Sequence, residues 1–205
     1  MSQTIVLHPA YPDPQLLDAI IKGLHAGAVI AYPTDSGYAL GCRLGLHKPL
    51  QRIEKIRKLP ASHNYTLMCR SLSEIATYAR VDTAMYRLMK RLLPGGYTFI
   101  LPATQEVPKV MQPNKKTIGI RIPDHPVALA IVNTLDEPLL STTLILPEQD
   151  EPLTDPEDVS DWVGEEVDII IDGGYCGFEP TSVIDLTDGE PVLVREGSGD
   201  VSWIS

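Results

Sequence analysis

The chain has 205 residues, of which 43% are hydrophobic and 21% charged, and its net charge is −10 at pH 7. These values are typical of one globular domain and exclude a disordered chain, so we expect a single domain over residues 1–205. No apolar run approaches the roughly 20 residues that span a bilayer, and the N-terminus lacks a basic leader and a signal-type apolar core; we therefore expect a cytoplasmic protein with no membrane partner.

The charge is distributed unevenly. Fifteen of the 17 Lys and Arg residues lie between Arg43 and Arg121, where only four acids occur, whereas 20 acids and one cation, Arg195, follow from Ile122 onward. A basic middle segment is compatible with a polyphosphate or RNA ligand. Charges spread over solvated helix faces remain the alternative explanation.

The three cysteines, Cys42, Cys69 and Cys176, are far apart and form no CxxC pair. This spacing indicates neither a zinc site nor a disulfide framework. We therefore expect no metal ligated by protein side chains.

Apolar runs alternate with amphipathic stretches, and no internal repeat or linker is visible. Asp13 and Pro14 begin the first predicted helix, and Gly27 ends it. A second helix ends near Pro60, a short third is capped by Ser71 with Glu74, and a fourth is capped by Asp82. Two later helices are expected, one over residues 125–135 and one begun by Asp155 and Pro156.

The predicted strands cover residues 28–32, 38–42, 66–69, 97–101, 118–122, 139–146, 167–172, 182–186 and 192–196. The last two are joined by the turn TDGEP and predict a hairpin. So many strands per helix favour an α/β fold with a twisted mixed sheet over a purely parallel one.

No Walker loop and no GxGxxG motif is present, so phosphate binding would depend on basic and hydroxyl side chains. The segment AYPTDSGYALG places Thr34 and Asp35 between two predicted strands. A simple hairpin turn, in which Asp35 bonds neighbouring amides, explains this segment equally well. Lys55, Arg57 and Lys58 lie at a helix C-terminus, where cations also occur because they favour the helix dipole.

Taken together, these segments resemble the YrdC family. YPTDSGYALG is similar to its YPTDTxYGLG signature, and Lys55 with Arg57 falls at its KxR pair. The resemblance continues in order through PGGYTFIL, TIGIRIPDHP, PLLSTTLIL, DGG, PTSVIDL and VLVREG, so it covers nearly the whole chain. It implies an α/β sheet curved around an open, positively charged cleft.

The resemblance also implies an activity. Members of this family combine L-threonine, bicarbonate and ATP into threonylcarbamoyl-AMP, which feeds a modification of tRNA. ATP is then a substrate, with Mg²⁺ held mainly by its phosphates, and tRNA or double-stranded RNA is a further partner. His63 and His125 are tempting as bases, but structural or solvated roles are the more common case.

By position, the resemblance places ATP against Lys55, Arg57, Asn64, Thr117, Thr143 and Arg195. Lys55 and Arg57 form the catalytic pair, because they would stabilise charge on the phosphates. L-Threonine would contact Thr34, Cys69, Arg121, Ser141 and Thr181. Arg121 suits its carboxylate, since a planar guanidinium can make two parallel charge-assisted hydrogen bonds.

Two departures from the family pattern resemble its YciO branch. The expected SxN asparagine is Ile145, which offers no side-chain hydrogen bond, and LPASH lengthens the loop between Arg57 and Asn64. Three hypotheses follow: a threonylcarbamoyl-AMP synthase; a paralogue with lost or altered synthase activity that acts on threonylcarbamoyl groups of tRNA; and a nucleotide or double-stranded RNA-binding module.

Overall fold

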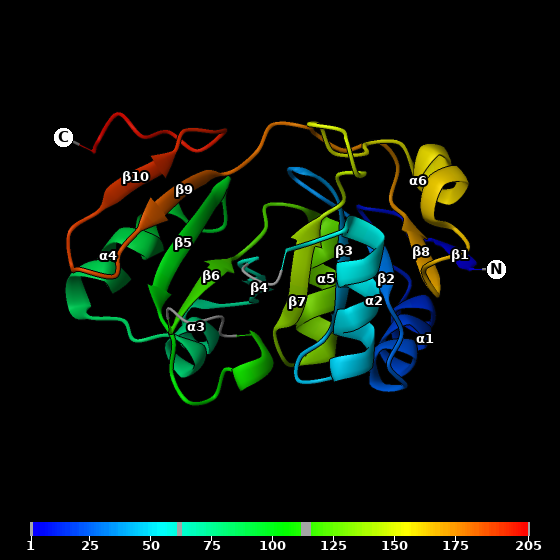
Figure 1. Ribbon diagram of the computed structural model, residues 1–205, viewed down its shortest axis with the longest axis horizontal. Coiled ribbons are helices and arrows are strands. Elements are labelled where there is room, and N and C mark those ends of the chain that lie inside the picture. The colour runs from blue at the N-terminus through cyan, green and yellow to red at the C-terminus, as the bar shows by residue number, and fades with distance from the viewer. Residues whose placement is uncertain (1, 61–62, 112–115, 205) are drawn as a thin grey trace.

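The protein is described by a computed structural model that covers residues 2–60, 63–111 and 116–204. Within these residues, ten strands form one mixed sheet in the order β1-β8-β2-β3-β7-β4-β6-β5-β9-β10 (Figure 1). The strands are β1 (Gln3–Val6), β2 (Ile30–Thr34), β3 (Gly37–Arg43), β4 (Thr66–Met68), β5 (Tyr97–Pro102), β6 (Thr117–Arg121), β7 (Leu139–Thr143), β8 (Ile169–Asp172), β9 (Ser182–Asp185) and β10 (Val192–Arg195).

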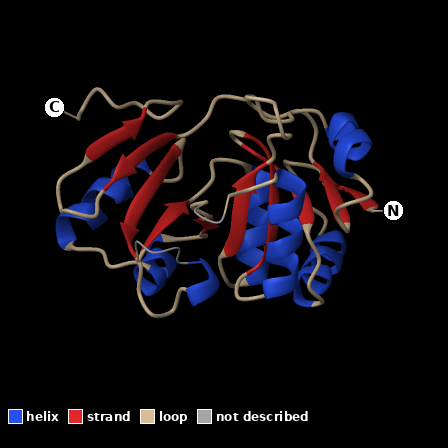
Figure 2. Cartoon of the chain, in the orientation of Figure 1, coloured by secondary structure: helices blue, strands red, loops and turns tan. Residues whose placement is uncertain are grey.

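The helices of the described residues lie on both sides of this sheet (Figure 2). They are α1 (Pro14–His25), α2 (His47–Arg57), α3 (Leu72–Tyr78), α4 (Thr83–Leu92), α5 (Pro126–Leu135) and α6 (Pro156–Val163), with a 3₁₀ segment, η1 (Lys109–Met111). The predicted α/β fold with a mixed sheet is therefore confirmed. None of these helices combines the length and apolar character needed to span a bilayer.

Local capping explains where the helices begin. Asp13 accepts a hydrogen bond from the Gln15 amide at 2.8 Å, and Asp82 accepts one from the Met85 amide at the same distance. The predicted capping box at α3 forms only in part. Ser71 Oγ accepts from the Glu74 amide, but the Glu74 carboxylate accepts from the amide of Arg70, one residue before the cap.

Two buried clusters hold the layers together. Helices α1 and α5 pack on one face of β2 and β8, where Ile20, Leu24 and Ile131 meet Ile30 and Ile171. The larger cluster joins α2, α3, α4 and α6 to the sheet and includes Ala31 of β2 and Ile170 of β8. Large aliphatic side chains dominate both clusters, so each helix is fixed to the sheet mainly by the burial of apolar area.

Most strand boundaries differ from the prediction by one or two residues, and the end of β7 differs by three. β7 ends at Thr143 rather than at residue 146, because the Ile145 amide bonds back to the Thr143 carbonyl and the Tyr38 amide of β3 donates to Leu153 instead. β2 begins at Ile30, two residues late. β1 was not predicted, since a four-residue edge strand with one buried side chain gives little periodic signal; it pairs in parallel with β8.

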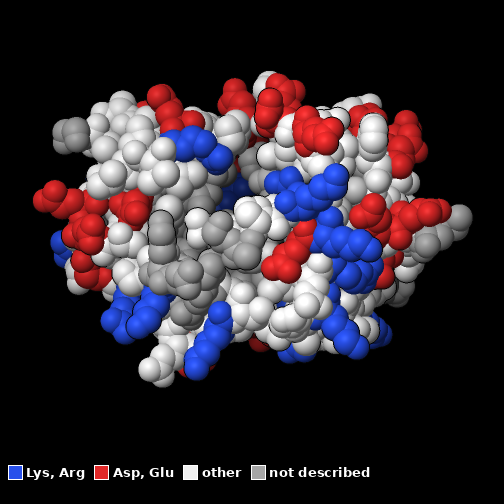
Figure 3. All heavy atoms as spheres, in the orientation of Figure 1, with Lys and Arg blue, Asp and Glu red and all other residues white. Residues whose placement is uncertain are grey.

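The sheet divides into two halves that differ in direction (Figure 1). One half is β1-β8-β2-β3-β7 and the other is β4-β6-β5-β9-β10. Figure 3 shows Lys and Arg side chains gathered over α2, while Asp and Glu predominate along the upper edge of the same view. The junction between the halves is the place where residues distant in sequence come together.

Candidate functional site

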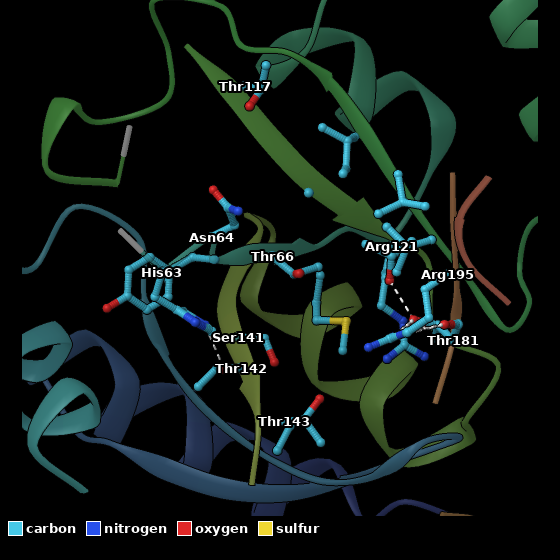
Figure 4. Close-up of a pocket in the computed structure, with 18 of the residues that line it drawn as sticks. His63, Asn64, Thr66, Thr117, Arg121, Ser141, Thr142, Thr143, Thr181 and Arg195 are labelled. Carbon is cyan, nitrogen blue, oxygen red and sulfur yellow. Dashed lines mark hydrogen bonds between the residues drawn. The ribbon is translucent and has the colours of Figure 1, made fainter. Parts of the chain in front are cut away.

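A cavity of about 690 Å³ lies at the junction of the two sheet halves (Figure 4). Its lining comes from β2 and β7 on one side and from β5, β6, β9 and β10 on the other. Eight of the eleven predicted site residues line it: Thr34, Asn64, Thr117, Arg121, Ser141, Thr143, Thr181 and Arg195. The family motifs, spread over the chain, therefore meet at one place.

Arg121, at the end of β6, is almost fully buried, with 5% of its surface exposed. Its Nη1 donates to Ser36 Oγ at 2.8 Å, and its Nη2 lies 2.5 Å from Asp35 Oδ1. This ion pair joins the two sheet halves, because Asp35 and Ser36 connect β2 to β3. The buried Nε of Arg121 has no partner among the described residues, so one N–H remains to be satisfied.

The turn between β2 and β3 holds Thr34 in a fixed orientation. Thr34 Oγ1 donates to the Gly37 carbonyl at 2.7 Å and accepts from the Ser36 amide at 3.0 Å. Gly37 has φ +97°, and a Cβ there would lie 2.5 Å from Pro152. Only glycine avoids both the backbone strain and this clash. The turn therefore depends on Thr34 and Gly37 rather than on Asp35, whose carboxylate bonds Arg121, and it places Thr34 against the cavity.

Arg195 lies beside Arg121 and faces the cavity from β10 (Figure 4). Its Nη2 donates to the Thr181 carbonyl at 2.9 Å, and Thr181 Oγ1 lies 2.8 Å from Thr98 Oγ1. Burial, and next the positive charge of Arg121, lower the pKa of Arg195. Two neighbouring positive charges repel each other. A bound anion would relieve this repulsion, so the pair of guanidiniums favours an anionic ligand.

On the opposite wall, Ser141 Oγ lies 2.6 Å from the phenol oxygen of the buried Tyr32. Burial raises the pKa of Tyr32, so the phenol stays protonated. His63 Nε2 lies 3.2 Å from Thr142 Oγ1, and both line the cavity. Burial, and then the charge of Arg57, lower the pKa of His63, which is therefore neutral near pH 7.

Three predicted site residues do not line the cavity. Cys69 is fully buried in the larger core cluster, and Lys55 opens onto a separate surface hollow between α2 and α6. Arg57 donates to the Ile145 carbonyl and lies near enough to His63 to influence its pKa. Arg57 therefore lies at the rim of the cavity. The residues Ala61 and Ser62 of the lengthened loop lie outside the described residues.

Several polar lining residues, Asp185, His63 and Thr142 among them, were not among the predicted site residues. Asp185 ends β9 and belongs to the PTSVIDL segment, where its position at a strand end was an available signal. His63 and Thr142 face each other only because β7 and the loop before β4 meet in space. No local pattern in the sequence predicts that contact.

Comparison with known proteins identifies the family. The model of the Sua5/YciO/YrdC family, described as "Telomere recombination", matches residues 22–197. The chain is 52% identical over 202 residues to the uncharacterized protein YciO of Escherichia coli (strain K12), covering 98% of each chain. The crystal structure of E. coli YciO matches with a TM-score of 0.95 at 50% identity over the full length of both chains.

A second group of relatives carries the synthase name. The chain is 29% identical over 177 residues to a threonylcarbamoyl-AMP synthase of Pyrococcus abyssi (strain GE5 / Orsay). This match covers 85% of this chain and 52% of that protein. The crystal structure of P. abyssi Sua5 complexed with L-threonine matches with a TM-score of 0.88 at 25% identity, over 96% of this chain and 58% of that one. The predicted family is thus confirmed, and the chain belongs to the Sua5/YciO/YrdC family.

Proposed function

We propose that this protein binds L-threonine and ATP in the cavity and catalyses synthesis of threonylcarbamoyl-AMP, in a pathway that modifies tRNA. The observation that carries the proposal is the pairing of Arg121 and Arg195 at one hydroxyl-lined cavity. The relation to a Sua5 structure complexed with L-threonine supports it. Two adjacent guanidiniums in a concave site suit a ligand that carries both a carboxylate and a phosphate.

The threonine would lie at the Arg121 end. The unpartnered Nε of Arg121 can donate to the carboxylate, while Thr34, Ser141 and Thr181 offer hydroxyl groups nearby. Asp35 holds the guanidinium in place, so little side-chain freedom is lost when a ligand binds. Cys69 has no exposed surface with which to assist.

The nucleotide would extend from Arg195 along the other wall, where Asn64, Thr117 and Thr143 line the cavity. Of the residues described along this cavity, Asp185 alone carries a carboxylate, and it lies on β9 away from the guanidiniums. Mg²⁺ would therefore be held mainly by the phosphates, where it neutralises their charge. A triphosphate extending outward would meet two further cations, Arg57 at the rim and Lys55 beyond it.

The chemistry asks for positioning rather than for a protein nucleophile. The threonine amine and bicarbonate form a carbamate and water. A carbamate oxygen then attacks the α-phosphorus of ATP in line, and the bond to the bridging oxygen breaks to release pyrophosphate. Arg195 would stabilise charge on the α-phosphate oxygens, while Arg121 fixes the threonine.

The proposal is tested by incubating the protein with ATP, L-threonine and labelled bicarbonate. We expect labelled threonylcarbamoyl-AMP and pyrophosphate release that requires both threonine and bicarbonate. Arg121→Ala should abolish product formation, whereas Arg87→Ala, which removes an exposed charge on α4, should not. Pyrophosphate release without threonine would contradict the proposal.

A second candidate is a paralogue with altered activity, acting on threonylcarbamoyl groups of tRNA. It is favoured by Ile145, which stands where the family pattern has asparagine and lies outside the cavity lining, with its carbonyl bonded to Arg57. We expect the wild-type protein to make threonylcarbamoyl-AMP slowly. A fast wild-type synthase would remove the reason for this candidate. Release of threonine from modified tRNA, measured in parallel, would support it.

A further inference from the structure

Asp185 is a carboxylate in a cavity that otherwise offers cations, hydroxyl groups and apolar side chains. It is half-buried at the end of β9. Its Oδ1 accepts two hydrogen bonds from Thr187, one from the amide at 2.8 Å and one from the hydroxyl at 2.6 Å. Its Oδ2 has no hydrogen-bond partner among the described residues, which leaves one acceptor on an immobilised carboxylate.

The strand register offsets this carboxylate from Arg195 only modestly. Arg195 lies opposite Val183, which is two residues, or about 7 Å, before Asp185 along β9. The Arg195 guanidinium turns the other way and bonds the carbonyl of Thr181, four residues before Asp185. Figure 4 shows Arg121 beside Arg195, with Thr117 at the opposite end of β6. The cavity therefore has a cationic end and an acceptor end.

Apolar side chains line the cavity between Asp185 and Arg195. Ile100 is the β5 neighbour of Asp185, and Val183 precedes it by two residues on the same face of β9. Val194 of β10 completes a narrow aliphatic surface along the cavity. A flat aromatic base can pack against such a surface and present a polar edge to the carboxylate.

We propose that Asp185 is a specificity-determining residue, whose Oδ2 accepts a hydrogen bond from the exocyclic amino group of an adenine base. The inference rests on the proposed function, in which the phosphates of the nucleotide face Arg195. The carboxylate repels phosphate and therefore also fixes the direction in which the nucleotide lies. It rejects a 6-oxo base such as hypoxanthine, because two acceptors would then face each other.

The test compares Asp185→Asn with wild type in the binding of ATP and ITP, measured by calorimetry. Asparagine keeps an acceptor for Thr187 but replaces Oδ2 with an amide donor, so the turn is preserved and the recognised group is inverted. We expect wild type to prefer ATP by about tenfold or more, the range for a hydrogen bond to a charged group, and Asp185→Asn to lose or reverse this preference. Asp185→Ala, which offers neither group, should bind both nucleotides about equally.

Asp188→Asn is the matched control, since it removes the same charge from an exposed residue of the same turn and should leave the preference unchanged. Binding of 2′-deoxy-ATP distinguishes the base from the ribose. If the 2′-hydroxyl were the donor, wild type would discriminate against 2′-deoxy-ATP and Asp185→Asn would not, which would overturn the assignment to the base. An unchanged ratio of ATP to ITP in Asp185→Asn would overturn the role of Asp185 alone, whereas no ATP binding by wild type would overturn the proposed function as well.

Discussion

The phenol oxygen of Tyr32 lies 2.6 Å from the hydroxyl oxygen of Ser141. Among the described residues, Ser141 is the sole hydrogen-bond partner of that buried phenol, and a buried donor without an acceptor would be costly. The direction that satisfies the phenol has Tyr32 donating, which leaves the Ser141 proton available to a ligand oxygen in the cavity. Tyr32 is therefore a positioning residue that acts through Ser141.

Tyr32→Phe should weaken L-threonine binding by about 1 kcal/mol, because Ser141 then loses the partner that orients it. Calorimetry on Tyr32→Phe, Ser141→Ala and the double variant measures the coupling of the two residues. Tyr38→Phe is the control, since that buried phenol donates to the Gly174 carbonyl outside the cavity lining. If Tyr32→Phe weakened L-threonine binding equally in the wild-type and in the Ser141→Ala background, the assignment would be contradicted.

Arg195→Ala should weaken ATP binding by about 1 to 3 kcal/mol, the range for a lost charged hydrogen bond. The fold should persist, because β10 is exposed and the Arg195 side chain bonds only Thr181 among the described residues. Calorimetry gives the affinity and thermal unfolding gives the stability. Unchanged ATP affinity would leave Arg195 with a purely structural role.

Replacing both Lys55 and Arg57 with Ala should abolish ATP binding while AMP still binds. In the proposed binding mode, the outer phosphates of a triphosphate would reach Arg57, whereas a monophosphate would stay near Arg195. Lys55 is exposed and should contribute little to the melting temperature, whereas Arg57 is half-buried and bonds the Ile145 carbonyl, so its replacement should lower the melting temperature somewhat. Lys90→Ala with Arg91→Ala removes the same charge from α4 and is the control. An equal loss of ATP and AMP binding would argue against a role at the outer phosphates.

The lowered pKa of His63 predicts that the free energy of unfolding depends on pH. Burial lowers its pKa in the folded protein, so the unfolded chain binds the proton more readily. Above the unfolded pKa of about 6.5, His63 is neutral in both the folded and the unfolded state. As the pH falls below that value, the unfolded chain gains a proton and the free energy of unfolding decreases. We expect the free energy of unfolding in urea to fall from pH 7.5 to 5.5 more steeply in wild type than in His63→Gln. His25→Gln, at an exposed residue, should match wild type; identical slopes in all three proteins would refute the prediction.

Helix starts were predictable from the sequence because they depend on neighbours a few residues apart, as at Asp13 and Asp82. Which side of a strand faces the cavity was harder to predict. Met68 lines the cavity, and Cys69, one residue later, is buried in the core. Strand side chains alternate between faces, so a shift of a single residue in register exchanges a ligand contact for a core contact.

The positions of Lys55 and Arg57 show a second limit. Their spacing in the sequence is right for the family, but the direction of each side chain depends on where α2 ends and on the path of the chain after β7. Lys58 takes a left-handed conformation at the end of α2, and the Ile145 amide bonds back to the Thr143 carbonyl directly after β7. Neither event follows from local propensity alone.

The order of strands in the sheet also governs when the cavity can exist. β3 pairs with β7, and β5 pairs with β9, so each contact waits for a segment made much later in the chain. Pairings of such high sequence separation slow folding, because the entropy of closing long loops is lost before the contacts form. Arg195 lies on β10, the last strand of the described residues, so this side chain joins the cavity only when that strand has paired. During refolding, ligand binding should therefore recover with the slowest phase, and a ligand would report completion of the whole sheet rather than of either half.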